Sequence, residues 1–286
     1  MGLTMGTGPF GQHPAGSFGA ALERPPAVVY AEPYPRRVRA VIGGTTVADS
    51  DSVLLVHETG LLPVYYFPTV DVRIDALLPA GKNSVSPLLG EAERYSLHAE
   101  GRVVDAAAWG FSDAPDAAPA VAGHLAFAWH AVDSWFEEDD EILGHAPDPY
   151  HRIDVRQSSR EVLVRVDHIV VARSTAARLL FETGLPTRYY LPREDVDPSV
   201  LEPSDTHTRC AYKGLASYHS LRIRDEVRAD VVWYYPEPER EGEAVCDLLC
   251  FFHERAGVQV EVDGRPVRSG RSIWEGEQIP DIPLPS

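Results

Sequence analysis

The chain is poor in cysteine, and this shortage excludes two kinds of small stabilised fold. It contains three cysteines among 286 residues, Cys210, Cys246 and Cys250. Three are too few for a disulfide framework, and none of their spacings is the CxxC of a zinc site. We therefore expect reduced thiols and no bound metal.

Positive charge and long apolar runs are also scarce. Lys and Arg number 26 against 43 Asp and Glu, which gives a net charge of −17. Binding to nucleic acid or anionic membranes draws largely on Lys and Arg, so we expect neither partner. No run approaches the roughly 18 apolar residues of a membrane-spanning helix, and the first residues lack the pattern of a signal peptide. We expect a cytoplasmic protein.

The composition that remains is that of a folded globular chain, with 44% apolar and 24% charged residues. A chain of this length suffices for about two domains. Residues 1–35 are rich in Gly and Pro and largely lack apolar periodicity, which predicts a mobile N-terminal tail.

An internal repeat gives the domain organisation. The segment 58–68 (ETGLLPVYYFP) matches 182–192 (ETGLPTRYYLP), an offset of 124 residues. The same offset relates further pairs: Gly90 and Gly214, Trp109 and Trp233, Phe127 and Phe251. We therefore predict two tandem domains at 36–143 and 160–267, joined by a linker at 144–159 and followed by a tail at 268–286.

Each copy has the pattern of antiparallel strands. Hairpins are predicted over 37–48 and 161–172, with turns at Gly43-Gly44 and Asp167-His168. Further strands are predicted at β-branched or aromatic runs over 103–109, 227–234 and 245–252. Short helices are predicted after Pro68, after Pro192 and over 174–178. The fold class is mainly β: two compact antiparallel β domains with few short helices.

Motifs of the second copy carry a resemblance to a known family. They are Glu182–Pro192, Asp205–Tyr218 (DTHTRCAYKGLASY) and Trp233–Pro236 (WYYP), with Asp148–Asp154 in the linker. Over nearly all of 36–267 the chain resembles the domain of unknown function family 427, in its tandem form. That family is similar in fold to the Mss4-like β-tent group, which implies ligand binding in an aromatic pocket. Many members of that group hold zinc between two CxxC pairs, which this chain lacks.

The two copies differ at one reactive segment. The first copy has Ser86 and Leu89 at the positions of Cys210 and Lys213. Any chemistry of the Cys-x-Tyr-Lys-Gly segment therefore belongs to the second copy.

Lys213 is the main candidate for chemistry, because it lies among aromatic and small residues. Desolvation there favours a neutral, nucleophilic amine. The structural alternative is an ion pair with Glu182 or a cation–π contact with Tyr212 or Trp233. Glu182 is either an acid–base group or a turn residue that binds backbone amides. Tyr190 completes the catalytic candidates.

The expected pocket around Lys213 has further lining residues. Those of the second copy are Cys210, Tyr212, Tyr218, Trp233, Tyr235, Arg188 and His207. Candidates for a lid over the pocket are Trp109 and His124 of the first copy and the linker around Tyr150 and His151. Cys210 is an alternative nucleophile if nearby cations lower its pKa. The acidic run 137–141 is interpreted as an exposed stretch and not as a metal site.

Three functions fit these residues. The first is an enzyme without metal or organic cofactor that acts on a small polar metabolite, with lyase, isomerase or hydrolase chemistry at Lys213. The second is a module that binds a small ligand without turnover. The third is a structural protein, which the loss of the motif from the first copy argues against.

Overall fold

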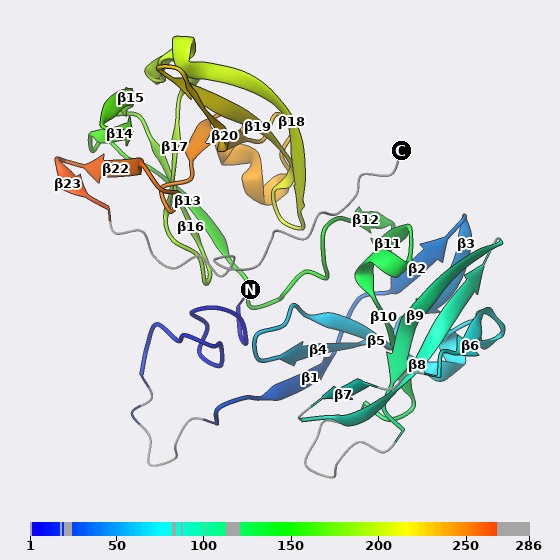
Figure 1. Cartoon of the computed structure of the whole chain (residues 1–286). Coiled ribbons are helices and arrows are strands. Elements are labelled where there is room, and N and C mark those ends of the chain that lie inside the picture. The colour runs from blue at the N-terminus through cyan, green and yellow to red at the C-terminus, as the bar shows by residue number, and fades with distance from the viewer. Residues whose placement is uncertain are drawn as a thin grey trace. The chain divides into compact units, whose positions relative to one another are not determined.

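The computed structural model describes residues 2–17, 19, 25–81, 84–86, 88–99, 101–112 and 121–267. These residues form two compact units that divide between residues 148 and 149. Every strand ladder in them is antiparallel, and the helices are short 3-10 turns (Figure 1). Among the described residues no helix has the length and apolar character that a membrane crossing requires.

The first unit contains a large and a small sheet. The strands of the large sheet follow the order β1 (Val29–Pro33), β4 (Leu54–Glu58), β5 (Val64–Pro68), β10 (His124–Phe127), β9 (Arg102–Gly110), β8 (Gly90–Ala99) and β6 (Leu77–Pro79), with β7 (Ser84–Ser86) also paired to β8. The small sheet follows the order β12 (Asp140–Ile142), β11 (Ser134–Glu137), β2 (Val38–Ile42) and β3 (Thr45–Ser50). The 3-10 turns of the first unit are η1 (Thr69–Asp71), η2 (Ile74–Ala76) and η3 (Trp129–Ala131).

The second unit repeats this arrangement. Its large sheet follows the order β13 (Ile153–Gln157), β16 (Arg178–Glu182), β17 (Arg188–Leu191), β21 (Leu249–Phe251), β20 (Glu226–Tyr234), β19 (Gly214–Ile223) and β18 (Leu201–Cys210). Its small sheet follows the order β15 (Ile169–Ser174), β14 (Val162–Val166), β22 (Val258–Val262) and β23 (Arg265–Pro266). The 3-10 turns are η4 (Arg193–Asp195), η5 (Pro198–Val200) and η6 (Arg240–Val245).

The two units share one strand order, which confirms the predicted tandem antiparallel β fold. Each strand has a counterpart about 124 residues later, and the long strand β18 takes the places of both β6 and β7. The predicted hairpins form β2–β3 and β14–β15, each with a bulge at the same position of the repeat. The predicted short helices after Pro68 and Pro192 are η1 and η4.

The hairpin turns show why these sequences reverse direction. Gly43 and Gly44 have φ of +57° and +79°, and Asp167 and His168 have φ of +48° and +68°. Positive φ at both central residues is the signature of a type I′ turn, whose twist matches that of the paired strands. Asp and His adopt in the second unit a conformation that glycine supplies in the first.

Adjacent tyrosines divide the core of each unit between the two faces of its large sheet. Tyr65 belongs to the cluster between the two sheets, and Tyr66 belongs to a smaller cluster on the other face. Tyr189 and Tyr190 divide in the same way in the second unit. This alternation follows from the two-residue period of a strand, and it places the aromatic residues of the candidate site on the outer face of the sheet.

Four segments depart from the sequence-based expectations. Strands β1 and β13 form inside the predicted tail and linker. Each is an edge strand of a large sheet and pairs through its backbone with β4 or β16. The strand predicted over 245–252 is limited to β21, since Asp247 has φ of +57° and interrupts the extended backbone. No helix forms over 174–178, where the Ala176 amide donates to Ser174 Oγ in a tight turn.

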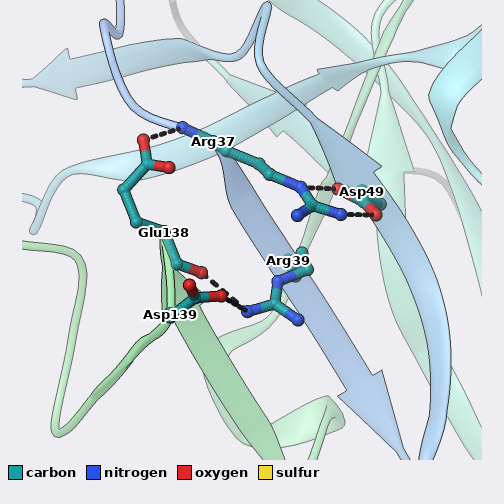
Figure 2. A network of polar contacts seen from close by, with 5 residues as sticks. All are labelled: Arg37, Arg39, Asp49, Glu138 and Asp139. Carbon is teal, nitrogen blue, oxygen red and sulfur yellow. Dashed lines mark hydrogen bonds and ion pairs between the residues drawn. The ribbon is translucent and has the colours of Figure 1, made fainter.

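Residues of the acidic run 137–141 form polar contacts with arginines (Figure 2). Arg37 donates to both carboxylate oxygens of Asp49, at 2.7 and 2.6 Å, and its amide donates to Glu138. Arg39 donates to the Glu138 carbonyl and to Asp139. Exposed pairs of this kind contribute about 0–1 kcal/mol each. Across the part of the chain that the structure describes, no group of three or more His, Cys, Asp or Glu side chains could hold a metal ion.

Glu137 itself is the exception in this run, because it is buried. Its carboxylate accepts hydrogen bonds from Tyr34 at 2.6 Å and from Tyr65 at 2.5 Å, and Arg36 pairs with its other oxygen. The run therefore combines one core carboxylate with solvated neighbours, and only the neighbours match the exposed stretch that we predicted.

Candidate functional site

Lys213 and Glu182 form a buried ion pair in the second unit. The Lys213 ammonium donates to Glu182 Oε2 at 2.5 Å. Lys213 is 6% exposed and Glu182 is 7% exposed. Glu182 is the last residue of β16, and Lys213 directly precedes β19. The structure thus forms the ion pair that the sequence left as the structural alternative.

The turn that carries Lys213 is fixed by glycine and by a covering turn. Gly214 has φ of +87°, a conformation open to glycine, and a Cβ there would lie 3.1 Å from the Glu239 amide nitrogen. The Glu239 amide donates to the Lys213 carbonyl at 3.0 Å. Gly242 of η6 packs on the Lys213 backbone, because a Cβ added at Gly242 would lie 3.3 Å from the Lys213 Cα. The lysine therefore lies beneath η6.

His151 contacts the second carboxylate oxygen of Glu182. Its Nε2 lies 3.1 Å from Glu182 Oε1, and the imidazole is buried. The ring stacks on Tyr212 with centroids 4.1 Å apart. A residue from the predicted linker is thus part of the charged cluster.

The protonation states of this cluster follow from burial and charge. Burial opposes the charge on both partners, yet the pKa of Glu182 is lowered to about 2 by Lys213 and His151. Burial likewise opposes the ammonium, but attraction to Glu182 raises the pKa of Lys213 above its ordinary value. Burial lowers the pKa of His151. At neutral pH the pair is charged and the imidazole is neutral, which disfavours a neutral amine nucleophile at Lys213.

A second buried ion pair lies beside the first. Arg188 Nη1 lies 2.6 Å from the Glu254 carboxylate, and both side chains are nearly fully buried. The Arg188 guanidinium also lies 5.3 Å from the centroid of the Trp233 ring. Arg188 was expected at the site, whereas its partner Glu254 was not.

The aromatic candidates form the wall of this cluster. Trp233 donates from Nε1 to the Tyr190 hydroxyl at 3.0 Å. Tyr218 and Thr208 share a hydrogen bond of 2.7 Å, and Tyr235 packs in the same buried cluster. Tyr190 is fully buried, and burial raises its pKa well above the ordinary value. Its contacts fix the position of Trp233.

The cysteines differ in their surroundings. Cys210 is half-buried at the end of β18, where it pairs in register with Gly214. Cys250 is buried, and burial raises the pKa of its thiol. Cys246 is exposed, and its Sγ lies 3.4 Å from the Pro236 carbonyl oxygen.

The remaining candidates are His207 of the second unit and His124 and Trp109 of the first unit. His207 is exposed on β18, with Nδ1 2.9 Å from the Asp205 carbonyl oxygen. His124 begins β10 of the first unit, and its Nδ1 lies 3.1 Å from the Ala122 carbonyl oxygen. Trp109 has in the first unit the role of Trp233, donating to Tyr66 at 3.0 Å.

Sequence comparison agrees with the internal repeat. The model of a family described as Domain of unknown function (DUF427) matches residues 30–138 and 154–264. No curated protein matches the chain. The two matched segments cover most of the chain, so the chain belongs to this family and contains two tandem copies of its domain.

Proposed function

We propose that this tandem DUF427 protein is an enzyme without metal or organic cofactor, whose second repeat binds a small polar metabolite at Lys213. The observation that carries the proposal is the buried Lys213–Glu182 pair at a position where the first repeat has Leu89. Replacing a buried ion pair with apolar residues of similar volume is often neutral or stabilising. The first repeat builds the same turn around leucine, so the fold does not require the charge.

A second substitution between the repeats supports the same conclusion. Arg188, which pairs with Glu254, has Val64 as its counterpart in the first repeat. Two buried cations therefore replace two apolar residues on one face of one sheet. Buried ionisable groups gathered in this way are characteristic of functional sites.

The charge state of Lys213 defines the chemistry that we propose. An ammonium held by Glu182 stabilises negative charge that develops on a substrate oxygen, as oxyanion-binding groups do. Carbonyl and carboxylate compounds offer such an oxygen in lyase, isomerase and hydrolase reactions. Glu182 serves as the counter-ion that keeps Lys213 charged. Since Lys213 lies beneath η6, substrate entry requires movement of this cover.

Ligand binding without turnover is the second candidate, and the pKa values of the pair favour it. An acid or base catalyst works best with a pKa near the working pH. The pKa of Glu182 is lowered to about 2 and that of Lys213 is raised, so both move away from neutrality.

One experiment separates the two candidates. The full chain is incubated with a mixture of 2-oxo and 2-hydroxy acids, product formation is followed by mass spectrometry, and binding is followed by ligand-observed NMR. The matched variants are the double variant Glu182→Gln/Lys213→Met, which removes both charges, and Leu89→Met in the first repeat. Turnover by the native chain and Leu89→Met, but not by the double variant, supports the enzyme.

Two other outcomes are informative. Binding without product that is lost in the double variant supports the binding module. A double variant that binds and turns over like the native chain contradicts both candidates, as does a native chain that neither binds nor converts any compound of the mixture.

A further inference from the structure

The first repeat contains an open cleft on the outer face of its large sheet. The cleft has a volume of about 320 Å³, and its walls include members of the apolar cluster on that face. Clefts of roughly 300–1,000 Å³ are typical of small-molecule sites. The polar and aromatic lining consists of Glu58, Tyr66, Ser86, Arg94, Trp109 and Phe111, and aliphatic side chains complete it.

The carboxylate at this cleft is the counterpart of the one that binds the buried ammonium in the second repeat. Glu58 and Glu182 each end the strand next to the edge of a large sheet, and each pairs with the first residue of the edge strand, β1 or β13. Each also contacts the hairpin between β7 and β8 or between β18 and β19. Ser86 Oγ donates to Glu58 at 3.2 Å, and Lys213 donates to Glu182 at 2.5 Å. The backbone therefore presents both carboxylates in the same way.

The first repeat has this carboxylate but neither of the ionisable partners of its counterpart. In the second repeat those partners are Lys213 and His151. The first repeat has Leu89 and Ala27 at the two positions. Across the described ranges of the chain, no Lys, Arg or His side chain forms an ion pair with Glu58. The carboxylate thus lines the cleft without a cation of its own chain.

The surroundings of Glu58 suit a cation that is attached to an apolar group. Glu58 is half-buried, so its attraction for a cation is screened less than that of a fully exposed carboxylate. Trp109 and Phe111 offer a flat apolar wall, on which such a group can pack. Arg94 lies over the Trp109 ring, 4.8 Å from its centroid. Its positive charge repels an ammonium, which favours the Glu58 end of the cleft for that group.

We infer that this cleft binds a small primary amine with an apolar body. The ligand's ammonium has at Glu58 the place that the Lys213 ammonium has at Glu182. Its body packs against Trp109 and Phe111. The second repeat carries as a side chain the cation that the first repeat takes from solution. This site lies in the other repeat from the proposed function and shares no residue with it.

Three probes test the inference by isothermal titration calorimetry on the full chain. Phenethylamine has both the ammonium and the phenyl body, 2-phenylethanol has the body without the charge, and methylamine has the charge without the body. We expect phenethylamine to bind about tenfold tighter than either of the others, since one charged contact or one buried ring contributes at least that factor.

Two variants test the role of the carboxylate. Glu58→Gln weakens phenethylamine about tenfold and leaves 2-phenylethanol unaffected. Leu89→Lys gives the first repeat the lysine of the second, and its ammonium competes with phenethylamine for Glu58 and weakens binding by a similar factor. Near-UV circular dichroism checks that each variant is folded. If Leu89→Lys does not fold, Glu58→Gln alone decides.

The double variant Glu182→Gln/Lys213→Met is the control, and it keeps native affinity for phenethylamine. A failure of the proposed function therefore leaves this result unchanged. The inference is overturned if phenethylamine does not bind, if it binds no tighter than 2-phenylethanol, or if folded Glu58→Gln binds it like the native chain. Loss of binding in the double variant also overturns it, because the amine would then bind in the second repeat.

Discussion

Lys213 and Leu89 occupy the same position of the two repeats, each directly before a glycine with φ close to +88°. Leu89 is 1% exposed and packs in an apolar cluster, whereas Lys213 is 6% exposed and pairs with Glu182. One backbone turn therefore accepts a buried leucine or a buried ammonium. The difference between the repeats lies in the chemistry of the side chain and not in the fold that presents it.

The first prediction concerns the stability of this pair. Lys213→Met leaves Glu182 buried without its cation, which we expect to lower the free energy of unfolding by about 3–5 kcal/mol. The double variant Glu182→Gln/Lys213→Met removes both charges and recovers most of that loss. Urea denaturation followed by circular dichroism measures both.

Leu89→Met is the matched control in the first repeat, because it keeps apolar volume and changes no charge. It should cost less than about 1.5 kcal/mol. If Lys213→Met is as stable as the double variant, then groups other than Lys213 fully stabilise the buried charge of Glu182. The ion pair would then contribute little to the free energy of unfolding.

The second prediction concerns the three thiols. Cys246 is exposed, Cys210 is half-buried, and Cys250 is buried with a pKa raised by burial. Since the thiolate is the reactive form and needs access to reagent, Ellman's reagent should modify Cys246 first and Cys210 second. Cys250 should react only after unfolding.

Serine variants of Cys246 and Cys210 assign the two native-state phases. A Cys210 that reacts faster than Cys246 would contradict this order. It would also revive the alternative in which nearby cations activate Cys210 as a nucleophile.

Much of the fold follows from the sequence alone, because its signals are local or self-similar. The offset between Trp109 and Trp233 defines the repeat, and paired turn residues such as Asp167-His168 define hairpins. Strands β1 and β13 were missed because they match each other poorly in sequence, VYAEP against IDVRQ. Their place is set by backbone pairing with the sheet, which leaves little trace in side-chain pattern.

The sequence predicts part of the candidate site, because two of its residues stand out in the comparison of the two copies. Glu182 stands out within the repeated Glu-Thr-Gly motif, and Lys213 stands out because the first copy has Leu89 at that position. The sequence offers their ion pair as one alternative for Lys213. The linker around His151 is predicted as a cover of the pocket, but its contact with Glu182 and the contact of Glu254 with Arg188 are not predicted. These two contacts depend on how strands are ordered in the sheet, which single-sequence patterns do not specify.

The last prediction is that acid lowers the stability of the chain in two separate pH ranges. Burial lowers the pKa of His57, His151 and His253, so these rings stay neutral in the folded chain below their ordinary pKa of 6.5. The unfolded chain then binds more protons, and the free energy of unfolding falls as pH decreases below about 6.5. The pKa of Glu182 is instead lowered from 4.5 to about 2, so its contribution is complete above 4.5 and is lost as pH falls toward 2. That contribution is roughly 3 kcal/mol.

Urea denaturation at a series of pH values from 8 to 2.5 measures both ranges. His151→Gln should make the fall in the upper range smaller, because it removes one of the buried neutral imidazoles while His57 and His253 remain. It should leave the lower range, because the amide can still donate to Glu182. The double variant Glu182→Gln/Lys213→Met should reduce the fall in the lower range, because it removes the contribution of Glu182 while other carboxyl groups with a lowered pKa, such as Glu254, remain. A stability that stays constant between pH 7.5 and 5 in the native chain would show that the buried histidines take up protons as readily in the folded state as in the unfolded one, and would contradict the burial on which this prediction depends.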